Sequence, residues 1–151
     1  MQQPNRQNYQ GRQGGDFQQL SAAERFFGNS LRFNPEWITG QADKSLVEFA
    51  ENAGKFMADK GLTNSKIRSI YGEIKRIQMG TFEEEKPSFY LLKPKVAYAL
   101  GRDKNNEGLK LFKLVFDKCY EKVSDAKTYL NFCNVIEAIL AYHKAYVKKN
   151  D

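Results

Sequence analysis

Residues 43–61 read DKSLVEFAENAGKFMADKG and have the apolar spacing of an amphipathic helix. Asp43 is a favourable N-cap, and Gly61 fits the position that follows a helix C-terminus. The stretch predicts one helix with a single buried stripe, because apolar side chains recur every three or four residues. The stripe consists of Leu46, Phe49, Ala50, Ala53, Phe56 and Met57.

The same spacing continues after this helix. Residues 63–79 form the next predicted helix, with Thr63 as its N-cap. A loop is predicted over residues 81–88, which contain an acidic run and a proline. The following helix is predicted to begin near Pro94, because proline is tolerated in the first turn of a helix.

The last third of the chain is also helical in pattern. An apolar stripe runs through residues 109–123, and a final helix is predicted over residues 124–148 with Ser124 as its cap. No segment alternates apolar and polar residues over the length of a strand. We therefore expect an all-α fold, a single-domain bundle of five or six helices over residues 17–151.

The N-terminal part differs from the rest in composition. Residues 1–16 are rich in Gln, Asn and Gly, so we expect a disordered tail that cannot bury enough apolar surface to fold. Residues 17–37 are rich in aromatic side chains, which we expect to clamp this arm onto the bundle. A short helix with a Ser21–Glu24 capping box and a second one with Pro35 in its first turn are predicted there.

Composition limits the classes of function. The chain has 151 residues and a formal net charge of +6, which fits a polyanionic partner. Cys119, Cys133 and a single histidine, His143, are too few for a zinc site, so we predict no metal and no cofactor. We also predict no catalytic residues, because no phosphate-binding glycine motif occurs and no carboxylate pair can be assembled. His143 is predicted to be a structural residue, half-buried and hydrogen-bonded across helices.

The N-terminus has no apolar leader, and no apolar run reaches the roughly 20 residues of a membrane span. We therefore expect a cytoplasmic protein.

Basic side chains gather on the helix predicted over residues 63–79. Arg68, Gly72, Lys75 and Arg76 lie three or four residues apart, opposite the apolar stripe. Such a row can follow a phosphate backbone and release counterions from it. Gly72 either lets a phosphate or a partner helix approach closely, or relieves crowding where two helices of this domain cross.

A second basic row follows in the next helix. Lys93 and Lys95 flank Pro94, and Lys95 and Arg102 are seven residues apart, hence on one face, with Tyr98 and Ala99 between them. The chain has no signature of an RNA fold that reads bases, so sequence-independent backbone contact is the main prediction. The alternative is that the basic rows dock onto acidic protein surfaces. The predicted RNA-binding residues are Arg68, Gly72, Lys75, Arg76, Lys93, Lys95 and Arg102.

Three stretches carry a resemblance to a known family. Residues 62–76 read LTNSKIRSIYGEIKR, residues 91–102 read LLKPKVAYALGR, and residues 132–146 read FCNVIEAILAYHKAY. In that order they resemble the small subunit of the Csm complex, the type III-A CRISPR interference machine. The six basic positions predicted above fall within the first two stretches, whereas the N-terminal tail is not part of the family pattern.

This resemblance implies an all-helical subunit without enzymatic activity of its own. Several copies would stack as an inner filament along the duplex of crRNA and target RNA and bind its backbone without regard to sequence. Their protein neighbours would be other copies of the same subunit, the repeating backbone subunits and the large polymerase-like subunit.

Overall fold

The computed structural model describes residues 20–148, and within that range it contains seven helices and no strand. The all-α prediction is confirmed, and the count exceeds five or six because two short helices precede the bundle. Residues 1–19 and 149–151 lie outside the described range. The prediction of a disordered tail over residues 1–16 therefore concerns residues that the structure does not describe. The helices are α2 (Ala22–Asn29), α3 (Glu36–Thr39), α4 (Lys44–Asp59), α5 (Asn64–Met79), α6 (Phe82–Gly101), α7 (Glu107–Tyr120) and α8 (Ala126–Tyr146).

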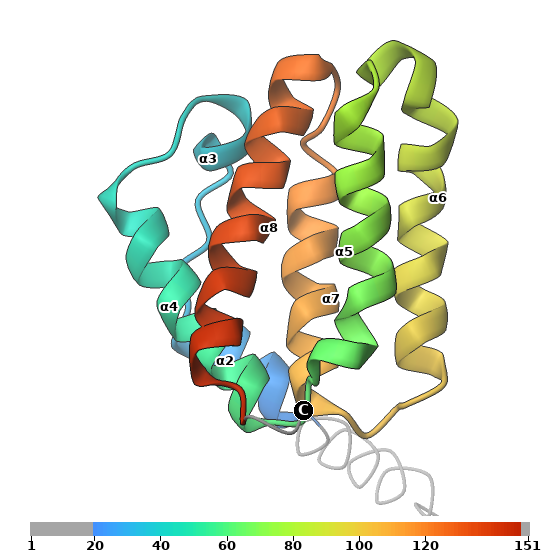
Figure 1. Ribbon diagram of the computed structural model, residues 1–151. Helices are drawn as coiled ribbons and strands as arrows, with labels where there is room; N and C mark the ends of the chain where they lie inside the picture. Colours follow the sequence, from blue (N-terminus) through green and yellow to red (C-terminus); the bar gives the residue numbers. More distant parts are fainter. Residues whose placement is uncertain (1–19, 149–151) are drawn as a thin grey trace, which may run out of the picture.

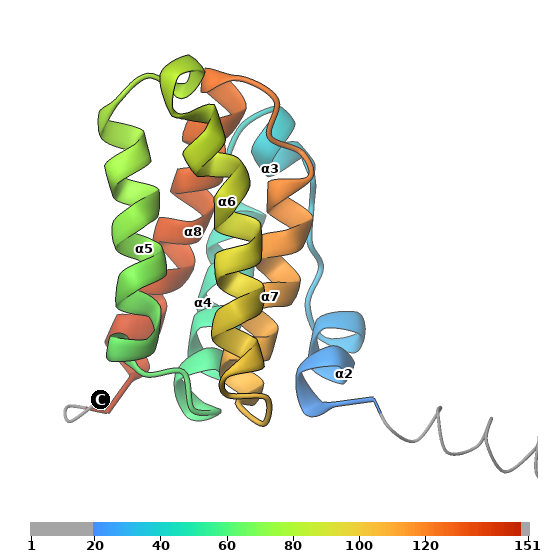
Figure 2. The ribbon, with the colours of Figure 1, turned by 90° about the vertical axis from the view of Figure 1, so that its right-hand side faces the viewer.

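The five long helices, α4 to α8, run side by side along one direction of the molecule (Figure 1). α5 packs between α6 and α8, while α4 packs most extensively on α8. The short helices cover other parts of the bundle, α2 on α7 and α3 on α8. Figure 2 shows α6 at the edge of the bundle, flanked by α5 and α7, so that its outer side meets no other described helix.

Small residues bring α4 and α8 into close contact. Ala50, Ala53 and Gly54 of α4 are buried. A Cβ atom added at Gly54 would lie 2.6 Å from the backbone oxygen of Ile139 and 2.7 Å from the backbone nitrogen of His143. Only glycine fits there, which explains why a residue that weakens helices is kept in the middle of α4.

Aromatic residues fasten the N-terminal arm to the bundle, as predicted. Phe26 stacks on Phe56 of α4 with 4.4 Å between ring centroids. Trp37 is buried among the aromatic rings between α3 and α4, and its indole nitrogen donates a hydrogen bond to Asp43. Pro35 directly precedes α3 and does not lie in its first turn.

Most helix caps are those expected. Asp43 and Thr63 accept hydrogen bonds from backbone N–H groups at the starts of α4 and α5, and Gly61 has a φ of 101° just after α4. The predicted cap of the last helix was wrong by one residue. Asp125, not Ser124, caps α8 and forms a capping box with Thr128.

The prediction of a loop over residues 81–88 was wrong, because residues 82–88 form the first turns of α6. Thr81 caps the helix, and the acidic run lies in its first turn. Carboxylates in the first turn interact favourably with the positive end of the helix dipole. Phe82 and Phe89 are buried against the bundle. Their burial outweighs the unfavourable effect of Pro87, which lies inside α6 and not in a turn.

Pro94, the predicted start of the helix, also lies inside α6. Proline has no N–H to donate to the carbonyl four residues earlier, which belongs to Tyr90. The hydroxyl of Tyr120 on α7 donates a hydrogen bond to this Tyr90 oxygen, at 3.3 Å. A side chain of the neighbouring helix thus supplies the donor that Pro94 lacks.

His143 has a structural position. Its side chain is almost fully buried, and its Nε2 atom is hydrogen-bonded to the backbone oxygen of Leu62, between α4 and α5. The predicted structural hydrogen bond is confirmed. The side chain is buried more deeply than predicted, since it was expected to be half-buried. No helix within residues 20–148 combines the length and the apolar character that a membrane span requires.

Candidate nucleic-acid interface

An exposed row of side chains runs along the outer side of α5. Arg68, Gly72 and Lys75 are exposed, while Ile67, Ile70, Ile74 and Ile77 on the opposite side are buried. We call Arg68, Gly72 and Lys75 the α5 ridge. The helical spacing predicted this arrangement, and the ridge lies between α6 on one side and α8 on the other (Figure 2).

No residue in the range 20–148 crowds Gly72. A Cβ atom added there would meet no atom within 4 Å among the described residues. The interpretation that Gly72 relieves crowding between two helices of this domain was therefore wrong. Its backbone is open to an external group, which is the other interpretation.

Arg68 forms no ion pair with any residue in the range 20–148. It lines a hollow of about 430 Å³ between α5 and α8, together with Tyr71, Glu137 and Lys144. An arginine without a carboxylate partner keeps its donors available for an external anion, and it can hold a phosphate in a two-pronged geometry.

The other two predicted cations of α5, Lys75 and Arg76, have acidic partners. The Lys75 ammonium lies 3.5 Å from Glu137 on α8, and the nearby Tyr71 and Glu137 raise the pKa of Lys75. Arg76 donates two hydrogen bonds to Glu73, at 2.9 and 3.0 Å, and forms an ion pair with Glu85 at the start of α6. The Glu73 hydrogen bonds, and then Glu85, raise the pKa of Arg76. Arg76 is thus the least available of the predicted cations.

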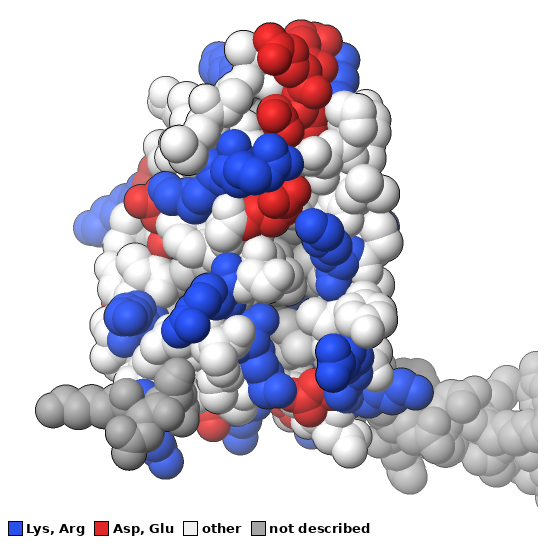
Figure 3. All heavy atoms as spheres, turned by 45° about the vertical axis from the view of Figure 1, so that its right-hand side comes forward, with Lys and Arg blue, Asp and Glu red and all other residues white. Residues whose placement is uncertain are grey.

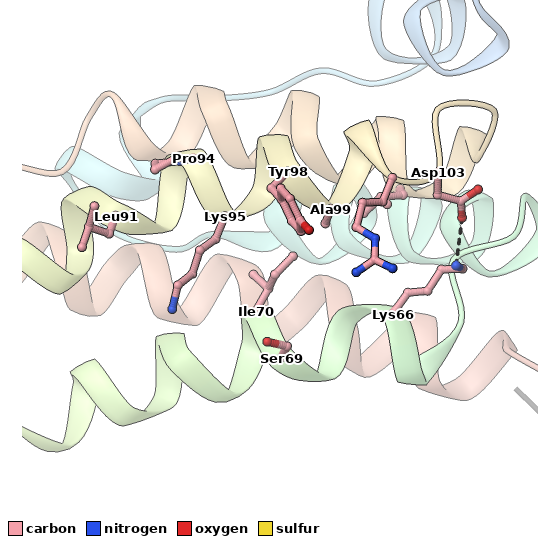
Figure 4. Close-up of a pocket in the computed structure, with 11 residues that line it drawn as sticks. Lys66, Ser69, Ile70, Leu91, Pro94, Lys95, Tyr98, Ala99 and Asp103 are labelled. Atoms are coloured by element: carbon pink, nitrogen blue, oxygen red, sulfur yellow. Dashed lines mark ion pairs between the residues drawn. The ribbon is translucent and has the colours of Figure 1, made fainter.

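A groove of about 740 Å³ separates α5 from α6 (Figure 4). We call it the α5–α6 groove. Lys95, Tyr98, Ala99 and Arg102 of α6 all line it, so the predicted second row is brought together on one side of the helix. In Figure 4 the Lys95 side chain extends from α6 toward α5. Its ammonium lies 3.8 Å from a carboxylate oxygen of Glu73 on α5.

Lys93 stands apart from the other predicted residues. Its ammonium lies 3.9 Å from Asp117 and 5.2 Å from the ring centroid of Tyr120, and both of these residues belong to α7. The structure therefore places Lys93 on the α7 side of α6, away from the α5–α6 groove. Its role in RNA binding stays a prediction.

Lys66 was missed in the sequence. It lines the α5–α6 groove and forms an ion pair with Asp103 at 3.0 Å (Figure 4). A signal was available, because Lys66, Ser69 and Glu73 follow the same three- and four-residue spacing along the side of α5 that faces α6. This spacing overlaps with that of the buried isoleucines, which obscured it.

Charges on this face are unevenly distributed. Figure 3 shows Lys and Arg side chains spread over much of the face, while the largest group of Asp and Glu side chains lies at its upper end. The start of α6, with Glu83, Glu84 and Glu85 in its first turn, lies at that end (Figure 1). A polyanion would therefore favour the middle and lower parts of the face over the upper end.

Groups able to perform chemistry are sparse in the described part of the chain. Within residues 20–148 no three His, Cys, Asp or Glu side chains are grouped so that they could hold a metal ion. Cys119 and Cys133 are buried thiols, and burial raises the pKa of both, that of Cys133 to about 11. A thiol with a raised pKa is a poor nucleophile at neutral pH.

Comparisons with known proteins give one result. No significant match was found among curated proteins or among solved structures. A family model described as Csm2 Type III-A matches residues 40–149, which include α4 to α8, and the chain therefore belongs to the Csm2 family, the small subunits of type III-A CRISPR complexes.

Proposed function

We propose that this protein is a non-catalytic subunit that binds RNA along the α5 ridge. The observation that supports it best is the open backbone at Gly72 between the exposed cations Arg68 and Lys75. A mid-helix glycine costs about 1 kcal/mol relative to alanine, and no contact in the described fold explains it. A phosphate group that approaches the helix backbone does explain it.

The ion pairs on this face do not prevent such binding. The Lys75–Glu137 pair is about half exposed on both sides, and exposed pairs contribute roughly 0–1 kcal/mol. A phosphate can therefore replace Glu137 as the partner of Lys75 at little cost. Each phosphate contact releases counterions from the RNA, which is the main source of affinity for a basic surface of this kind.

The proposed binding is independent of sequence. The ridge consists of cations and an open glycine, which contact phosphates and do not read base edges. Family membership adds the assembly to this proposal. In it, the subunit stacks in several copies along crRNA paired with target RNA, next to the backbone subunits and the large polymerase-like subunit, in the cytoplasm.

The experiment is a comparison of RNA affinity at several salt concentrations for the full chain and two arginine variants. Arg68→Ala should weaken binding to unrelated RNA duplexes by similar factors. It should also make the plot of log binding constant against log salt concentration less steep, by about one unit of slope. Arg32→Ala is the matched control, since Arg32 is also exposed, also forms no ion pair within residues 20–148, and lies between α2 and α3. Equal affinities and slopes for wild type and Arg68→Ala would refute the proposal.

A second candidate function is protein docking with only incidental RNA contact. Four predicted RNA-binding cations, Lys75, Arg76, Lys93 and Lys95, already have acidic partners, which reduces the positive charge that this face offers to RNA. In that case the Arg68→Ala variant would fall out of the purified complex while its own RNA affinity stayed unchanged.

A further inference from the structure

The α5–α6 groove has apolar walls that the fold leaves open to solvent. Tyr98 is 67% exposed and Leu91 is 58% exposed, although both are large apolar side chains. Pro94 and Ala99 lie beside them along α6, and Ile70 contributes from α5. In Figure 4, Tyr98 projects from α6 over the space between the two helices. An exposed aromatic ring beside an apolar hollow can cover a flat, apolar ligand group.

Cations surround this apolar surface. Lys66, Lys95 and Arg102 line the groove, and Asp103 is the single acidic side chain among its lining residues. Lys66 is paired with this Asp103. Arg102 forms no ion pair within residues 20–148, and its guanidinium lies 5.8 Å from the ring centroid of Tyr98. Lys95 is paired with Glu73 of α5. The groove thus combines an exposed aromatic ring, with Arg102 over one of its faces, and a guanidinium that no carboxylate within residues 20–148 neutralises.

A ligand that fits both features has a flat ring and an anionic group at short range. A nucleotide has this chemistry, because its base can stack on an aromatic side chain and its phosphate can pair with arginine. A base inside a duplex is stacked and paired, so its face is not available to Tyr98. A base that fits here must be unpaired.

We propose that the α5–α6 groove is a binding site for one unpaired nucleotide of an RNA strand. Its base stacks on Tyr98 beside Leu91 and Pro94, and its phosphate pairs with Arg102. This inference rests on the proposed RNA binding and adds a second element to it. The α5 ridge holds the backbone, while the groove takes a base that has left the stack.

The test measures the affinity of the full chain for three RNAs that differ at one position. The first is a perfect duplex, the second has one unpaired nucleotide in a bulge, and the third has an abasic residue in the same bulge. Wild type should prefer the bulge with a base over the abasic bulge by about tenfold. Tyr98→Ala should remove this preference and leave the affinity for the abasic bulge unchanged.

Two further variants define the site. Tyr98→Phe keeps the ring and should keep the preference. Tyr90→Ala is the matched control, because Tyr90 is another exposed tyrosine of α6, at 56%, but does not line the groove. It should also keep the preference. A preference that survives Tyr98→Ala, or that is lost equally in Tyr90→Ala, would overturn the proposal.

Failure of this inference differs from failure of the proposed function. If wild type binds the three RNAs equally and Arg68→Ala weakens all of them, the ridge binds RNA and the groove does not. If Tyr98→Ala instead loses other subunits of the complex without any change in RNA affinity, the groove binds protein. If the full chain binds none of the RNAs, both proposals fail together.

Discussion

Replacing Gly72 by alanine should make the folded protein more stable. Gly72 lies in the middle of α5 and is exposed, and a Cβ atom there would meet nothing within 4 Å among the described residues. The new methyl group therefore causes no clash within the described fold. Alanine also restricts the unfolded chain more than glycine does, which favours the folded state.

The expected size of the effect follows from helix propensity. Glycine is about 0.8–1.0 kcal/mol less favourable than alanine in an exposed helix interior, so the free energy of unfolding should rise by about 1 kcal/mol. For a chain of this size that corresponds to an increase in Tm of about 2–4 °C. Gly54→Ala is the contrasting variant. There the added Cβ would lie 2.6 Å from a backbone oxygen of α8, and overpacking should destabilise the protein by about 1–3 kcal/mol.

Urea unfolding followed by circular dichroism measures both variants. For Gly72→Ala we expect a higher urea midpoint and an unchanged m-value, the slope of the free energy of unfolding against urea concentration. This result would show a gain in stability without a change in the surface exposed on unfolding. If the proposed phosphate contact at Gly72 exists, the same variant should bind RNA less tightly than wild type, because the methyl group would occupy the space of that phosphate. A loss of stability in Gly72→Ala would refute the reasoning, since it would mean that the fold itself needs the open position.

Two further predictions concern titratable groups. Hydrogen bonds from Arg76, and then the charge of Lys95, lower the pKa of Glu73 below its ordinary value of 4.5. The ionised Glu73 therefore stabilises the fold at pH values above 4.5. This contribution is lost as the pH falls through the lowered pKa. Acid unfolding of Glu73→Gln should therefore show a smaller loss of stability below pH 4.5 than wild type. Cys119 and Cys133 should not react with a thiol reagent at neutral pH until the protein unfolds, because both are buried; rapid labelling of the native protein, followed by absorbance, would contradict this burial.

The parts of the fold that could be predicted depend on neighbours along the chain. α4 and its caps follow from residues within one or two turns, so Asp43, Gly61 and the apolar stripe were sufficient. The start of α6 depends on distant residues. Pro87 and Pro94 suggested a loop and a late helix start, whereas the burial of Phe82 and Phe89 against the bundle and the Tyr120 hydrogen bond favour a continuous helix.

In the candidate site, too, the features that depend on one helix could be predicted and those that depend on neighbouring helices could not. The outward direction of Arg68, Gly72 and Lys75 follows from the 3.6-residue period of one helix. Arg76 and Lys93 also pair with Glu85 and Asp117, which reach them from other helices, and these two pairs could not be predicted in this way. The pair of Arg76 with Glu73 lies within α5, at a spacing of three residues. Spacing in the sequence thus indicates which cations are exposed, while the packing of helices decides which of them have acidic partners.

The side of α6 that borders the proposed groove is unusually apolar for a helix at the edge of a bundle. A helix at the edge of a bundle normally has a polar outer side, which gives it a clear periodicity. α6 buries Leu92 and Val96 on its inner side but also exposes Tyr90, Leu91 and Tyr98. Apolar residues on both sides weaken the helical period of α6. The inner apolar residues are explained by packing within the bundle, whereas the exposed outer apolar residues are not. Weak periodicity in an edge helix is therefore itself an indication of a ligand or partner on its outer side.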